Sequence, residues 1–202
     1  MSLSPRSLRP LTPSLPQFGG TKGVAALYVR RAALPRVGRM LRGGGQERGM
    51  RAGTESTVLL AGLGAAAQVT LDEGPAIYAH MAALRRRLLE GLRAGLAGHC
   101  ALRVNGPEAG EPALPNTLSV GLVGVRADAL LAALRDSVCA SASAACHSHE
   151  AASVSAVLRA MDVPLDAAIG TLRLSVGRHT TVEEVDEGVR RIVAEARGQL
   201  AK

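Results

Sequence analysis

The feature that most constrains this sequence is an alternating segment followed closely by a helix signal. Apolar and polar side chains alternate strictly in TLRLSV, residues 171–176, and a period of two is typical of a strand with one buried face. Its leucines are therefore expected to face the core, and Arg173 the opposite side. Thr181 and Glu184 have the spacing of a capping box, which predicts that a helix begins there.

The rest of the chain continues this alternation, which predicts the α/β fold class. The expected strands are residues 23–30, 101–105, 116–121 and 171–176, and the expected helices are residues 56–69, 75–97, 126–135, 151–161 and the segment after Thr181. The helix over 75–97 is expected to bury Ile77, Met81, Leu84, Leu88 and Leu92, and to leave Arg85, Arg86 and Arg87 on a solvated face. The helix over 151–161 is expected to bury Val154, Val157, Leu158 and Met161. The helix after Thr181 is expected to bury Val182, Val185, Val189, Ile192, Val193 and Ala196.

Composition bears on several function classes. The chain has 202 residues, of which 47% are hydrophobic and only 1% aromatic, so we expect a core of Ala, Leu and Val. No run of eighteen apolar residues occurs, and we expect no membrane span. The net charge of +7 is compatible with an anionic partner, but the arginines are scattered over the expected helices, which favours an ordinary basic surface. Because the basic residues are not interleaved with aromatic rings on which bases could stack, we expect no nucleic acid.

The start of the chain differs in composition from the rest. Residues 1–46 contain eight Lys or Arg side chains and no Asp or Glu. Residues 1–16 are rich in Ser, Arg and Pro, a composition similar to that of organelle transit peptides. Four prolines would interrupt an amphipathic helix there, so we expect a disordered leader. We expect a cytoplasmic protein, with a mitochondrion or plastid as the alternative.

Three cysteines cannot form an even disulfide framework, which favours a reducing compartment. Cys146 lies among small and polar residues, a composition that suits an exposed, reactive thiol, although a small buried hydrophobe is the alternative. Cys100 and Cys139 are expected to be such buried residues. His147 and His149 suggest a metal site, but no second ligand pair with zinc spacing exists, so we expect no metal.

Two further segments are candidates for binding anions. The glycine-rich loop GGGQERGMRAGT, residues 43–54, allows a backbone to approach an anion closely. Arg48 and Arg51 add charge there, and Thr54 adds a hydroxyl; a flexible surface loop is the alternative. Arg173 on its strand suits bidentate binding of a carboxylate, although the pattern alone favours an ordinary surface arginine.

Taken together and in this order, these segments resemble the cysteine desulfurase family and its selenocysteine lyase branch. The matching motifs are FGGTKGVAALYVR from Phe18, GGGQERGMRAGTES from Gly43, SASAACHSH from Ser141 and LRLSVGRHTTVEEVD from Leu172. The resemblance covers about residues 18–200. Four motifs in register make a chance agreement improbable.

The resemblance implies part of a type I pyridoxal-phosphate transferase fold. Its expected parts are a disordered leader (1–16), the end of the large cofactor-binding domain (17–70) and the small C-terminal domain (71–202). It also implies a homodimer that removes sulfur or selenium from L-cysteine or L-selenocysteine and leaves L-alanine, with active sites at the subunit interface. A chalcogen-acceptor protein is a further partner that it suggests.

By position within these motifs, the resemblance assigns roles to five residues. Cys146 would attack the chalcogen and carry it, and Arg173 would hold the substrate carboxylate. Thr54 would reach the phosphate of the cofactor in the neighbouring subunit. Gly53 and Arg51 would support the loop that carries Thr54.

One departure from the family pattern concerns the cofactor. Gln17 stands where the family has its Schiff-base lysine, and glutamine cannot form a Schiff base. Lys22 corresponds to a different, non-catalytic lysine of the family. The alternative to an enzyme is therefore a catalytically dead, truncated subunit that pairs with a full-length homologue. The sequence leaves open whether sulfur or selenium is the cargo.

Overall fold

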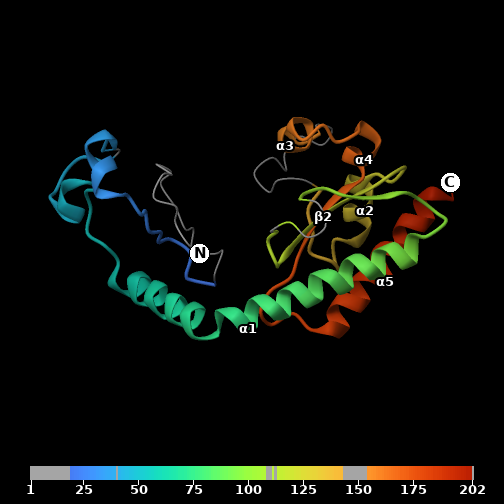
Figure 1. The fold of residues 1–202 in the computed structure, drawn as a ribbon, viewed down its shortest axis with the longest axis horizontal. Coiled ribbons are helices and arrows are strands. Elements are labelled where there is room, and N and C mark those ends of the chain that lie inside the picture. Colours follow the sequence, from blue (N-terminus) through green and yellow to red (C-terminus); the bar gives the residue numbers. More distant parts are fainter. Residues whose placement is uncertain (1–18, 40, 108–110, 112, 143–153, 202) are drawn as a thin grey trace. The chain divides into compact units, whose positions relative to one another are not determined.

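The computed structural model describes residues 19–39, 41–107, 111, 113–142 and 154–201 (Figure 1). The chain divides into two compact units, Met1–Gly74 and Pro75–Lys202. The expected division at residue 70 between a cofactor domain and a C-terminal domain stays a prediction. Within the described ranges, no helix combines the length and hydropathy that crossing a bilayer requires.

In the described part of the first unit, the regular elements are two short 3₁₀ helices, η2 (Arg31–Arg36) and η3 (Gln46–Gly49), and the start of α1 (Thr57–Leu96). No strand is formed over residues 23–30, where only the isolated bridge residues Ala25 and Tyr28 occur, so this prediction was wrong. Leu27 and Tyr28 in that segment are 54% and 51% exposed. A strand needs a hydrogen-bonded neighbour, and the described part of this unit contains no other strand to pair with.

The two helices expected over 56–69 and 75–97 form the single helix α1. It continues through Pro75, although proline removes one backbone hydrogen bond from a helix interior. The residues after Pro75 are held by burial of the predicted stripe, in which Met81, Leu84, Leu88 and Leu92 are at most 8% exposed. Ile77 is partly buried against the same core.

The second unit is built on a three-stranded antiparallel sheet in the order β1 (Leu102–Val104), β2 (Thr117–Leu122) and β3 (Thr171–Ser175). The predicted alternation in β3 is confirmed. The apolar side chains of β2 and β3 share one face and are at most 5% exposed: Leu118, Val120, Leu122, Leu172 and Leu174. They belong to one core cluster with the apolar stripes of α1 and α5 (Val182–Leu200).

The part of α1 after Pro75 runs parallel to α5 and lies beside it (Figure 1). A Cβ atom on Gly91 or Gly95 of α1 would collide with Val189 or Val193 of α5, so glycine permits this close approach. One turn earlier, Arg87 forms a bidentate ion pair with Asp186, at 2.6 and 2.7 Å. Its neighbour Arg85 is not simply solvated as expected, because its Nε donates to the carbonyl oxygen of Thr117 at 2.7 Å.

The capping box expected at the start of α5 is confirmed. The hydroxyl of Thr181 accepts from the backbone N–H of Glu184 at 3.2 Å, and the Glu184 carboxylate accepts from the N–H of Thr181 at 2.9 Å. Val185, Ile192 and Ala196 are buried as predicted, whereas Val182 is 40% exposed. Val182 occupies the first turn, where the helix has not yet reached the core.

We expect Thr181→Ala to lower the free energy of unfolding by about 1 kcal/mol, because it removes the acceptor for one unpaired N–H group of the first turn. Thr181→Ser keeps that oxygen and should stay within about 0.5 kcal/mol of the unaltered chain. Urea unfolding followed by circular dichroism measures both values. Equal losses in the two variants would contradict a capping role.

Three short helices complete the second unit: α2 (Ala127–Leu134), α3 (Ala156–Ala160) and α4 (Leu165–Ile169). Helix α2 packs against α5 in the main core. The helix expected over 151–161 is shorter than predicted, and residues 151–153 lie outside the described residues. Its inward face was predicted only in part, because Leu158 is buried but Val157 and Met161 are 58% and 42% exposed.

Candidate active site

Arg173 lies in the middle of β3 and is paired on both sides. Ser119 of β2 is its partner in the sheet. On its other side, Ser141 forms an antiparallel bridge with it, in which each residue donates its N–H to the other's carbonyl oxygen, at 2.7 and 3.2 Å. Because directly paired residues point to the same face of a sheet, the side chains of these three residues share the polar face.

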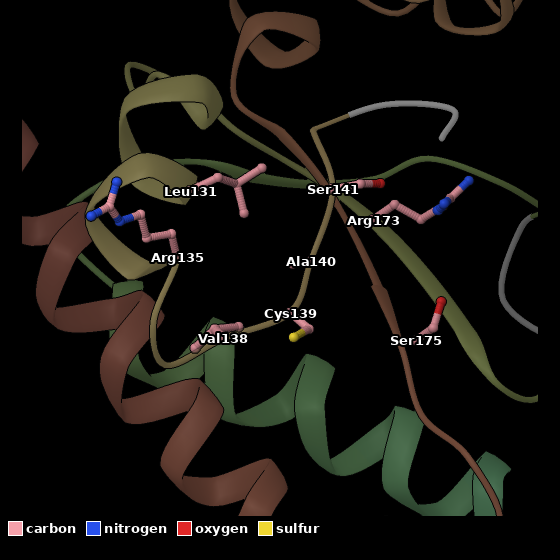
Figure 2. Close-up of a pocket in the computed structure, with 8 residues that line it drawn as sticks. All are labelled: Leu131, Arg135, Val138, Cys139, Ala140, Ser141, Arg173 and Ser175. Atoms are coloured by element: carbon pink, nitrogen blue, oxygen red, sulfur yellow. The ribbon is translucent and has the colours of Figure 1, made fainter. Parts of the chain in front are cut away.

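An open pocket of about 490 Å³ lies beside this bridge. The residues that line it come from α2, from the segment after α2 and from β3: Leu131, Arg135, Val138, Cys139, Ala140, Ser141, Arg173 and Ser175. Figure 2 shows Arg173 and Ser141 projecting to the same side, with Leu131 and Arg135 on the opposite side of the pocket. The pocket thus has two cationic groups, two hydroxyls and a thiol at its wall.

The two arginines of the pocket differ in their partners. Arg135 is paired with the carboxylate of Asp136 at 3.4 Å, and both side chains are largely exposed. Arg173 is half-buried, and its guanidinium makes no hydrogen bond or ion pair with any residue in the described ranges. A guanidinium that is partly withdrawn from water and lacks a carboxylate can bind an anionic ligand bidentately. Arg173 is therefore the candidate anion-binding group.

The three cysteines have different environments. Cys146 lies outside the described residues, as do His147 and His149. Cys139 is exposed and lines the pocket, so the prediction of a buried residue was wrong: the chain leaves α2 there and pairs with the outer edge of β3. Cys100 is half-buried, and this burial raises the pKa of its thiol.

The glycine-rich loop belongs to the first unit and has an unusual backbone. Gly49 and Gly53 have φ angles of +74° and +104°, and Glu47 and Arg48 also have positive φ angles, 51° and 56°. Non-glycine residues are uncommon in this region, and such residues persist where surrounding contacts hold them. The loop therefore has a defined backbone conformation that its own contacts maintain.

Two side chains of the loop form hydrogen bonds with the backbone of Gly53, the residue before Thr54. The side-chain oxygen of Gln46 accepts from the N–H of Gly53 at 3.2 Å, and Nη1 of Arg51 donates to the carbonyl oxygen of Gly53 at 3.1 Å. Thr54 itself is exposed. Its hydroxyl can donate to a phosphate oxygen, which fits the phosphate of a cofactor.

Each of the two units contains one described residue that suits an anion. Thr54 suits a phosphate and Arg173 a carboxylate. Lys22 is the one lysine in the described ranges, and Gln17 lies outside them. Those ranges contain no cluster of His, Cys, Asp or Glu that could hold a metal ion.

The family model for class-V aminotransferases matches residues 16–187. The chain belongs to the class-V aminotransferase family. Among its curated relatives, the cysteine desulfurase IscS of Anaeromyxobacter sp. (strain Fw109-5) is 43% identical over 178 residues. The match covers 88% of the chain and 42% of the relative. The selenocysteine lyase of Bos taurus is 41% identical over 183 residues, with 87% and 41% covered. The chain thus spans about two fifths of the length of these relatives.

A solved structure gives the same relationship at the level of the fold. The protein matches the structure of a NifS-like protein with a TM-score of 0.74 and 31% sequence identity. The match covers 91% of this chain and 44% of that structure. The match confirms the expected α/β fold, as part of a type I pyridoxal-phosphate transferase fold.

Two features of this site were not predicted from the sequence. The bridge between Ser141 and Arg173 joins segments 32 positions apart, and no local pattern signals such pairing. The bond from Gly53 to Gln46 was also not foreseen, although a polar side chain within a run of glycines is a signal that could have suggested it.

Proposed function

We propose that this chain supplies the substrate-binding and chalcogen-accepting residues of a pyridoxal-phosphate-dependent lyase. The reaction is removal of sulfur or selenium from L-cysteine or L-selenocysteine, which leaves L-alanine. The observation that carries the proposal is the half-buried Arg173 guanidinium, which lacks a carboxylate partner among the described residues. The backbone of Arg173 pairs with that of Ser141, five positions before Cys146. The cysteine desulfurase and selenocysteine lyase relatives support the choice of reaction.

Arg173 would bind the carboxylate of the amino-acid substrate. Its backbone is fixed by pairing on both sides, with Ser119 and with Ser141, so binding a ligand need not order the backbone at this position. Two parallel N–H···O bonds would orient the substrate as well as hold it.

Cys146 would accept the chalcogen. It follows Ser141 by five residues, and five residues span at most about 18 Å when fully extended, so its thiol is tethered to the neighbourhood of Arg173. The thiolate would form a bond to the substrate's sulfur or selenium as the bond from that atom to the β-carbon breaks. The bonding electrons stay with the carbon, which takes up a proton to give alanine. When bound, pyridoxal phosphate supplies the electron sink for this chemistry.

Thr54 would hold the cofactor's phosphate, with Gly53 and Arg51 shaping the loop that presents it. The chain contains two lysines, Lys22 and Lys202, and we assign neither as the covalent anchor. The lysine is then supplied by a cofactor domain outside this sequence. The active assembly that we propose is a dimer with sites at its interface.

The test is to co-express this chain with the lysine-bearing N-terminal part of the Anaeromyxobacter relative and to measure alanine released from L-cysteine. We expect Arg173→Ala to lower kcat/KM by about 10- to 100-fold, because two charge-assisted hydrogen bonds to the carboxylate are lost. Most of the loss should fall on KM.

Arg135→Ala is the matched control, since Arg135 lines the same pocket but is already paired with Asp136. We expect it to change kcat/KM by about twofold or less. Equal effects of the two substitutions would show that the pocket's charge matters and that Arg173 is no specific ligand.

A second candidate function is that of a catalytically inactive subunit that pairs with a full-length homologue. Large apolar side chains exposed in the first unit favour a partner there: Leu27, Tyr28, Leu41, Val58 and Leu71, each more than half exposed. This function predicts that the chain co-purifies with a full-length relative and that Cys146 stays unlabelled by sulfur in that complex. Labelling of Cys146 would exclude it.

A further inference from the structure

We propose that Gln46 is the positioning residue for Thr54, and that it acts by clamping the Gly53 peptide. The inference rests on the proposed function, which gives the Thr54 hydroxyl a phosphate to bind. Gln46 contacts no ligand in this scheme. It sets the backbone from which Thr54 projects.

The clamp has two arms that meet at one residue. Gln46 accepts from the N–H of Gly53 at 3.2 Å, and Arg51 donates to the carbonyl oxygen of the same residue at 3.1 Å. Both polar groups of Gly53 are thus engaged by side chains of its own loop. A φ angle of +104° is accessible to glycine at little cost, so without these bonds Gly53 could take up other conformations.

The loop leaves room for the Gln46 side chain at a second glycine. A Cβ atom on Gly44 would overlap the side-chain amide of Gln46, whereas a Cβ atom on the neighbouring Gly45 would meet nothing within 4 Å. A hydrogen bond also joins the two ends of the loop, because the N–H of Ala52 donates to the carbonyl oxygen of Leu41. Gln46 therefore crosses the inside of the loop, from Gly44 to Gly53.

The consequence concerns Thr54 because it directly follows Gly53. Rotation about the backbone of Gly53 would swing the Thr54 hydroxyl, and hydroxyl position decides whether it can donate to a fixed phosphate. Gln46 is neutral, so it can brace the loop without placing a negative charge beside the phosphate. A carboxylate at this position could accept the same N–H but would repel the ligand.

The first measurement is hydrogen exchange of the Gly53 amide, followed by NMR on the full chain. Gln46→Met keeps the length of the side chain and removes the acceptor, and we expect the Gly53 amide to exchange about 2- to 10-fold faster. Gln46→Glu keeps an acceptor and should preserve slow exchange. Gly44→Ala should speed exchange by displacing Gln46. The matched control is Gln68→Met, since Gln68 bonds Asp72 on α1 and should leave Gly53 unchanged.

The second measurement is the response of the Thr54 amide to inorganic phosphate. We expect a saturable shift in the unaltered chain, binding weakened about threefold or more by Gln46→Met and by Gln46→Glu, and no change with Gln68→Met. Thr54→Val should abolish the response and leave Gly53 exchange as it was.

The outcomes separate the inference from the function on which it rests. Unchanged Gly53 exchange or unchanged phosphate affinity in Gln46→Met would overturn the inference alone. An unaltered chain with slow Gly53 exchange but no phosphate response would overturn the phosphate role of Thr54, and the inference with it.

Discussion

The Cys146→Ser variant is expected to take up no sulfur at all when it is co-expressed with a lysine-bearing cofactor domain and given L-cysteine. A serine hydroxyl is not ionised at neutral pH and has no low-energy bond to form with sulfur, whereas a partly ionised thiol is a strong nucleophile. In the unaltered chain we expect the peptide that carries Cys146 to gain the mass of one sulfur atom. This is the largest functional effect that we expect from one substitution.

Cys139→Ser is the control, because Cys139 is exposed and lines the pocket beside Arg173. Trypsin leaves both cysteines on one peptide, residues 136–159, so fragmentation of that peptide must locate the added sulfur. We expect Cys139→Ser to retain at least half of the label. Sulfur on residue 139 of the unaltered chain would show that the exposed pocket thiol is the acceptor and that Cys146 is not.

The largest structural effect is expected from Gly170→Ala, which should lower the free energy of unfolding by about 3 kcal/mol. Its φ angle of −86° is ordinary, so the cost comes from space. A Cβ atom would overlap the carbonyl oxygen of Leu122 and lie 2.9 Å from that of Val125. Backbone atoms cannot rotate away as a side chain can, and the bond from the Leu122 N–H to the Gly170 oxygen, 3.1 Å, would be strained.

For a chain of this size, such a loss lowers Tm by roughly 6–12 °C, which scanning calorimetry or thermal circular dichroism can measure. Gly188→Ala is the matched control. Gly188 lies inside α5, and a Cβ atom there meets nothing within 4 Å. Glycine is a poor helix former, so we expect this variant to be more stable by about 0.5–1 kcal/mol. A loss of stability at both positions would refute the steric argument.

Features of the fold that depend on a local pattern of residues could be predicted from the sequence. The alternation of residues 171–176 predicted which side chains of β3 are buried, and the spacing of Thr181 and Glu184 predicted the start of α5. The motifs around Gly43 and Leu172 indicated the family, and the model for class-V aminotransferases matches residues 16–187. Helix α4 was missed, since five residues are too few to establish a helical period.

The sequence by itself determined the family, the elements of the sheet core and the residue types that can hold anions. Only the tertiary structure decided that residues 23–30 form no strand, that Cys139 faces a pocket and that Ser141 lies against Arg173. The physical reason is the same in each case. A strand, a pocket wall or a bridge depends on which distant segment supplies the partner hydrogen bonds, and a local pattern of residues carries no record of that partner.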